Sequence, residues 1–239
     1  MISLNNQCSG GRSPVGTSTA HPSPRNPAWQ RVRAQYRRAP IDAVRVVSAA
    51  AQALDAEFVE AMSAPGVVRC LQAALSVAPG DGSIESAVEA GVRAREVARA
   101  SLAAQGDSSR QAEIALDATF LTAMALAGSD AARPAGFEPS GAADQDASRW
   151  FAAHYLSRLF GHLVARDTAD VVGTPGLPDV QARCRLVEAA ERVCAEAVRD
   201  CPWAGAPQGD PAPLLRGLIT GALERLRAAR QVVVGIDMS

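Results

Sequence analysis

Apolar residues recur every three or four positions along most of the chain, which is the spacing of one face of an α-helix. Residues 41–64 show this spacing clearly, with Val44, Val47, Ala51 and Leu54 on one face. Pro, Gly, Asp and Ser interrupt the pattern at intervals and are typical of helix ends. The pattern predicts helices over residues 27–39, 41–64, 66–78, 84–105, 109–127, 147–166, 179–201 and 211–230.

These helices predict an all-α fold, a multi-helix bundle of about seven to eight helices. The low aromatic content, 4%, favours closely packed Ala-rich helices over sheets. Ser83 is a predicted N-cap, and Ser108 with Gln111 forms a predicted capping box. Residues 232–234 are three valines and could form a short strand, although one strand does not make a sheet.

Charge divides the chain into two unlike parts. Residues 1–41 hold six arginines and no carboxylate, a charge of +6, which leaves 18 arginines and all 25 acidic residues, a charge of −7, for the rest. The first part, up to residue 26, is too poor in apolar residues to offset its ordering entropy. We therefore expect four segments: a disordered Ser/Pro/Arg-rich arm (1–26), a short basic amphipathic helix (27–39), a helical domain (41–230) and a tail (231–239).

The short basic helix carries the predicted partner-binding residues. Its apolar stripe consists of Trp29, Val32 and Tyr36, and arginines surround it. The stripe either docks on the acidic body of the same chain, which we favour, or awaits a partner protein, a membrane surface or nucleic-acid phosphates. The candidate partner-binding residues are Trp29, Arg31, Arg33, Tyr36, Arg37 and Arg38.

The chain contains no lysine, although it has 24 basic residues. Mechanisms that need an ε-ammonium, such as the P-loop clamp or a Schiff base, are therefore excluded. The five cysteines are odd in number and include no CxxC pair, which argues against a disulfide framework and a zinc ribbon. Coding bias in a GC-rich genome is the favoured cause of the missing lysine, and selection against lysine modification in a protein that meets a ubiquitin system is the alternative.

Four residues are the best candidates for catalysis, although none is assigned a role. His154 and His162 lie eight residues apart on one predicted helix, about 12 Å along its axis, so they cannot share a metal without a third element. Asp167 and Asp170 follow the helix. GxSxG, HExxH, EF-hand and strand-borne GxGxxG motifs are absent. We expect no cofactor and no metal.

Two local patterns have competing interpretations. Residues 53–66 and 115–128 match at eight of fourteen positions, including Phe58 with Phe120, and indicate either a duplicated helical unit or coincidence in Ala-rich helices. Both interpretations place Leu54, Phe58, Met62, Leu116, Phe120 and Met124 in the core. Residues 101–116 superficially resemble a helix-turn-helix but have Gln105 and Ala112 at positions that should be large and apolar, which favours an ordinary helix–loop–helix.

The function expected from the sequence is a non-enzymatic α-helical protein-interaction protein, in the setting of a bacterial adaptor or exported effector. The composition of the arm resembles that of the front of bacterial proteins exported by injection-type systems, and transit peptides share it. The alternatives are a nucleic-acid-associated protein that uses residues 1–40 and a small metal-dependent hydrolase built on His154 and His162. The partner is another, unidentified protein. The expected location is the bacterial cytoplasm, with export as the alternative, and no integral membrane association is expected.

Overall fold

Helices make up nearly all the regular structure of the chain. The computed structural model describes residues 27–36, 41–77, 83–140, 143–202 and 210–234. Its helices are α1 Pro27–Gln35, α2 Ala43–Ala53, α3 Ala56–Ala61, α4 Pro65–Leu75, α5 Ile84–Ala104, α6 Arg110–Leu126, α7 Ala143–Thr168, α8 Val180–Arg199 and α9 Pro211–Val234, with single 3₁₀ turns η1 Asp130–Ala132 and η2 Ala169–Val171. Within these ranges β geometry is limited to one isolated bridge, Thr174 with Leu177. The all-α prediction is confirmed.

Side-chain caps mark the starts of α2, α3, α5, α6 and α8. Ser83 accepts a hydrogen bond from the amide of Ser86 at the start of α5, as predicted. The predicted box at Ser108 is wrong by one residue, because Ser109 has the extended backbone of an N-cap and its hydroxyl accepts from the amide of Ala112. Asp179 caps α8 by accepting from Ala182 at 2.6 Å.

Two further predictions are corrected by the structure. The helix expected over 41–64 is broken, because Leu54 is extended and Asp55 starts α3 by accepting from the amide of Phe58 at 2.8 Å. The valines at 232–234 do not form a strand but continue α9 to Val234. A continuous apolar pattern did not reveal the first break, since α2 and α3 bury their faces in the same core.

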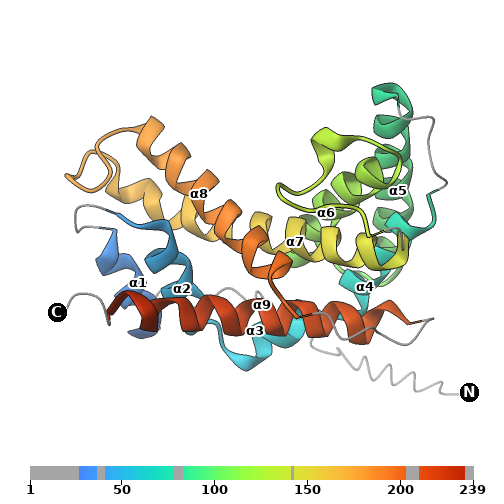
Figure 1. Cartoon of the computed structure of the whole chain (residues 1–239). Helices are drawn as coiled ribbons and strands as arrows, with labels where there is room; N and C mark the ends of the chain where they lie inside the picture. Colours follow the sequence, from blue (N-terminus) through green and yellow to red (C-terminus); the bar gives the residue numbers. More distant parts are fainter. Residues whose placement is uncertain (1–26, 37–40, 78–82, 141–142, 203–209, 235–239) are drawn as a thin grey trace, which may run out of the picture.

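α7 is the central helix of the molecule (Figure 1). It packs against α8, α6, α9, α4 and α2. Its largest apolar side chains are almost fully buried, and the rings of Phe151 and Tyr155 are stacked with centroids 6.1 Å apart. α9 runs along one side and packs against α2, where Arg227 of α9 donates to the carbonyl of Ala51 at 3.0 Å.

The internal similarity does not extend to the structure. Residues 53–66 span the end of α2, α3 and the start of α4, whereas 115–128 begin inside the unbroken helix α6 and end just beyond it. Phe58 and Met62 are buried as expected, but Phe120 and Met124 are only half-buried. The expectation that both pairs lie in the core is wrong for the second, because these side chains lie at the edge where α6 meets α5.

Candidate functional site

α5 and α6 form a close antiparallel pair at the edge of the molecule (Figure 1). The buried face of α5 is made of small residues, Ala87, Ala90, Gly91, Ala94 and Ala98, up to Leu102 near its end. A Cβ atom on Gly91 would lie 2.8 Å from the ring of Phe120 and 2.9 Å from Met124 Cγ. Gly91 therefore leaves the space that the side chains of Phe120 and Met124 on α6 occupy.

The same helix exposes a row of large apolar residues. Ile84, Val88 and Val92 follow at four-residue spacing and are 76%, 39% and 44% exposed. They lie within a sector of about 80° on the helix surface. Single exposed apolar residues are normal in soluble proteins, but these three stand in line along one helix. We call these three residues the α5 row.

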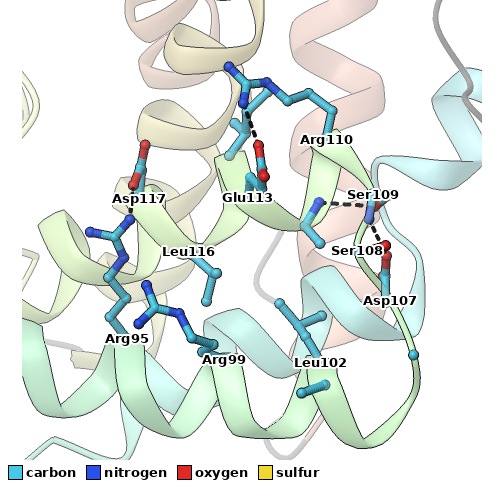
Figure 2. Close-up of a pocket in the computed structure, with 14 residues that line it drawn as sticks. Arg95, Arg99, Leu102, Asp107, Ser108, Ser109, Arg110, Glu113, Leu116 and Asp117 are labelled. Atoms are coloured by element: carbon cyan, nitrogen blue, oxygen red, sulfur yellow. Dashed lines mark hydrogen bonds and ion pairs between the residues drawn. The ribbon is translucent and has the colours of Figure 1, made fainter.

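A cavity of about 760 Å³ lies between the C-terminal half of α5 and the start of α6. Figure 2 shows Arg95 and Arg99 reaching from α5 toward α6, with Leu102 and Leu116 between the helices. Both leucines are buried, so the floor of the cavity is apolar. Arg110, at the start of α6, also lines it.

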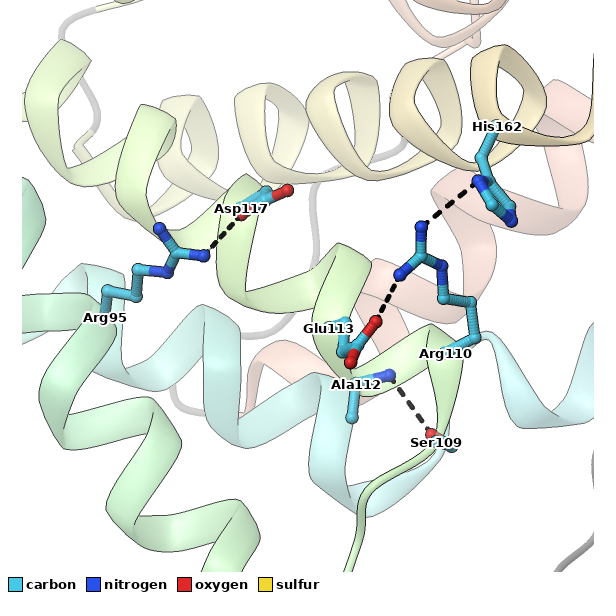
Figure 3. A network of polar contacts seen from close by, with 7 residues as sticks. All are labelled: Arg95, Ser109, Arg110, Ala112, Glu113, Asp117 and His162. Carbon is cyan, nitrogen blue, oxygen red and sulfur yellow. Dashed lines mark hydrogen bonds and ion pairs between the residues drawn. The ribbon is translucent and has the colours of Figure 1, made fainter. Parts of the chain in front are cut away.

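Most charged groups in the cavity are already paired (Figure 3). Arg95 Nη2 lies 2.8 Å from Asp117 Oδ1. Arg110 pairs with Glu113, and its other terminal nitrogen is 3.2 Å from Nδ1 of His162 on α7. Asp107 accepts from the amide of Ser109 at 2.9 Å and so fixes the loop between the helices.

Arg99 differs from the other charged residues of the cavity. The described part of the chain supplies no hydrogen-bond or ion-pair partner for its guanidinium. The Nε atom of Arg95 is shielded from solvent and also has no acceptor among the described residues. The cavity therefore has guanidinium hydrogens left for a further acceptor.

His154 lies elsewhere, in a cavity of about 310 Å³ formed by α7, α8 and the residues around η1. Burial lowers the pKa of His154 from 6.5 to about 4, with a hydrogen bond to the Ala132 backbone opposing the shift. Its Nε2 atom has no partner among the described residues. Burial also raises the pKa of Glu191, which pairs with Arg158 at 3.3 Å on the rim.

The other catalytic candidates lie apart from His154. His162 faces Arg110 on α6, as described above. Asp167 is buried at the end of α7, where Oδ1 accepts from Arg166 Nε at 2.8 Å and Oδ2 has no described partner. Asp170 is exposed in η2. The structure thus does not bring the four residues together, and the described residues contain no group of three or more His, Cys, Asp or Glu suited to a metal ion.

The short basic helix packs on the body through part of its stripe. Val32 is fully buried and Tyr36 is 1% exposed, and α1 packs against α2. Burial raises the pKa of Tyr36, and the nearby carboxylate of Asp167 adds to the shift. Docking of the stripe, the favoured alternative, is confirmed for these two side chains, so Tyr36 is not accessible to a partner.

The remaining predicted partner-binding residues have different positions. Arg31 and Arg33 are exposed on α1. Arg37, Arg38 and the side chain of Trp29 lie outside the described residues, as does the arm before Pro27.

Residues 101–116 form a helix–loop–helix with a tight turn at Gly106, whose φ is +67°. The polar residues that would face DNA bases in a helix-turn-helix are engaged or buried: Arg110 pairs with Glu113, and Gln111 is 6% exposed. This agrees with the ordinary helix–loop–helix.

Comparison with known proteins adds no relative: no family model, no curated protein and no solved structure matches the chain. In the part of the chain that the structure describes, every helix is too short or too polar to cross a membrane. The geometry of the α5 row and of the α5–α6 cavity is therefore the basis for a functional proposal.

Proposed function

We propose that this protein is a non-enzymatic α-helical interaction protein that docks a partner protein on α5. The observation that carries the proposal is the α5 row, Ile84, Val88 and Val92, exposed in line on a helix at the edge of the fold. Fully burying one such side chain stabilises a complex by about 1.5–3 kcal/mol. Val88 and Val92 are already more than half covered, so the row supplies part of the binding free energy of a partner helix or loop.

The position of α5 supports this role. α5 packs chiefly against α6 and α4 and takes little part in the core around α7. Phe120 and Met124 lie half-buried over Gly91, one turn from Val88, and extend the apolar surface toward α6. A partner can therefore cover this face without any change in the core. The setting that we propose, a bacterial adaptor or exported effector, rests on the composition of the arm alone.

A photo-cross-linking experiment tests the proposal. A benzophenone amino acid is placed at position 88 or, as a matched control, at position 97 of the full chain in the cells that produce it. Val97 is also an exposed valine of α5, 52% exposed, but lies about 180° around the helix from Val88. We expect a defined adduct from position 88 and none from position 97. Equal adducts from both positions, or none from position 88, would contradict the proposal.

A further inference from the structure

The α5 row and the arginines of the cavity share one face of α5. At 100° per residue, Arg95 and Arg99 fall inside the same sector of about 80° as Ile84, Val88 and Val92. The face is therefore apolar in its first half and basic in its second. Its length from Ile84 to Arg99 is about 22 Å, the length of a helix of some 15 residues.

The charges of the cavity decide which hydrogen-bond acceptor can bind the guanidinium of Arg99. Asp117 and Glu113 are held by Arg95 and Arg110, and Asp107 is held by the loop amide of Ser109. Arg99 has no such counter-charge among the described residues. One singly charged acceptor pairs with Arg99, whereas a doubly charged phosphate would also meet the three carboxylates of the lining.

We propose that the docking segment of the partner is an amphipathic helix that places apolar side chains on the α5 row and a carboxylate beside Arg99 in the α5–α6 cavity. The inference rests on the proposed function and adds the chemistry of the partner. A carboxylate matches the fork geometry of a guanidinium and can accept two hydrogen bonds from it. Leu102 and Leu116 form the apolar floor of the cavity, whereas Arg99 itself is exposed, so water and salt screen this pair.

Designed peptides test the inference directly. The probes are fluorescent helical peptides of about 18 residues with leucines at four-residue spacing in one half and either glutamates or lysines in the other half. A bound helix can run parallel or antiparallel to α5. Each peptide is therefore made in two versions, with the charged half at its C-terminal end or at its N-terminal end, so that one version can place this half near Arg99 in either orientation. Binding to the full-length protein is measured by fluorescence polarisation.

We expect the glutamate peptide, in one of its two directions, to bind about tenfold or more tightly than its lysine counterpart. Arg99→Glu should remove or reverse this preference. Arg93→Glu is the matched control: Arg93 is an exposed arginine of the same helix, about 180° around from Ile84, and its substitution should leave the preference unchanged. Val88→Glu should weaken both peptides.

The failures of the two proposals are distinguishable. Equal binding of the glutamate and lysine peptides, with both weakened by Val88→Glu, would overturn the acidic partner and leave the docking face standing. Binding that Val88→Glu does not affect would contradict both proposals. Absence of binding by every peptide would overturn the amphipathic acidic helix as the docking segment, while the cross-linking at position 88 judges the docking face separately.

Discussion

At the scale of the residue, side-chain size and burial determine the role of a few positions, of which Gly91 and His154 are examples. Gly91 leaves the space that Phe120 and Met124 of α6 occupy, and His154 is a histidine shielded from solvent. Neither role follows from residue type. Gly91 could have been an ordinary helix interruption, and His154 was a candidate for chemistry that the surrounding residues do not assemble.

Gly91→Ala should destabilise the protein although alanine is the better helix former. The added Cβ would meet Phe120 and Met124 at under 3 Å, so these side chains or the two helices must shift, at a cost of about 1–2 kcal/mol. Gly217→Ala in α9 is the matched control, because its Cβ would meet no atom within 4 Å, and it should gain about 0.5–1 kcal/mol. Urea unfolding measures both, and equal effects would contradict the close contact.

His154 should make folding stability depend on pH. Its pKa is about 4 in the folded protein and near 6.5 when unfolded, so the unfolded state binds more protons between these values. The free energy of unfolding should therefore fall as the pH decreases from about 6.5 to 4, by at most about 3 kcal/mol from this group. Arg158 and Glu191 line the same cavity as His154. Both residues are left unchanged in the variant, so that their own titration is the same in the two proteins compared.

The comparison is between the wild type and His154→Gln, unfolded in urea at several pH values. The variant should lose less stability than the wild type over this range. Parallel curves for the two proteins would contradict the buried, neutral state of His154.

At the scale of the element, most helices could be predicted because caps and breakers coincide with ends of the apolar pattern, as at Ser83 and Asp179. The break at Leu54 could not, because the pattern continues through it. α5 shows a second limit: it has two apolar faces, and the small-residue one is buried because it allows close packing. The cavity could not be predicted from the sequence either, because Arg95 and Asp117 come together only when α5 packs against α6.

The two similar segments allow a matched test of an element boundary. Asp55 and Asp117 occupy the same place in the 53–66 and 115–128 segments, but Asp55 caps α3 and Asp117 forms an exposed ion pair. Asp55→Ala should cost about 1 kcal/mol of folding stability. Asp117→Ala should cost about 0.5 kcal/mol or less. Equal losses in thermal or urea unfolding would contradict the different roles of the two aspartates.

At the scale of the whole molecule, a core built around α7 carries α5 and α6 at its edge (Figure 1). This arrangement separates folding from docking: the largest buried side chains of α7 hold the fold, while Ile84, Val88 and Val92 contribute little to it. Substitutions in the α5 row should therefore change binding and leave the melting temperature unchanged.

The most direct measurement is the dissociation constant of the complex with the partner that cross-linking identifies. Calorimetry determines this constant for the wild type, Val88→Glu and Val97→Glu. A charge in the centre of an apolar contact costs about 2 kcal/mol or more, so Val88→Glu should weaken binding about thirtyfold or more. Val97→Glu, on the opposite side of the same helix, should bind as the wild type does. Wild-type affinity for Val88→Glu, or the same loss in both variants, would contradict a docking face on α5.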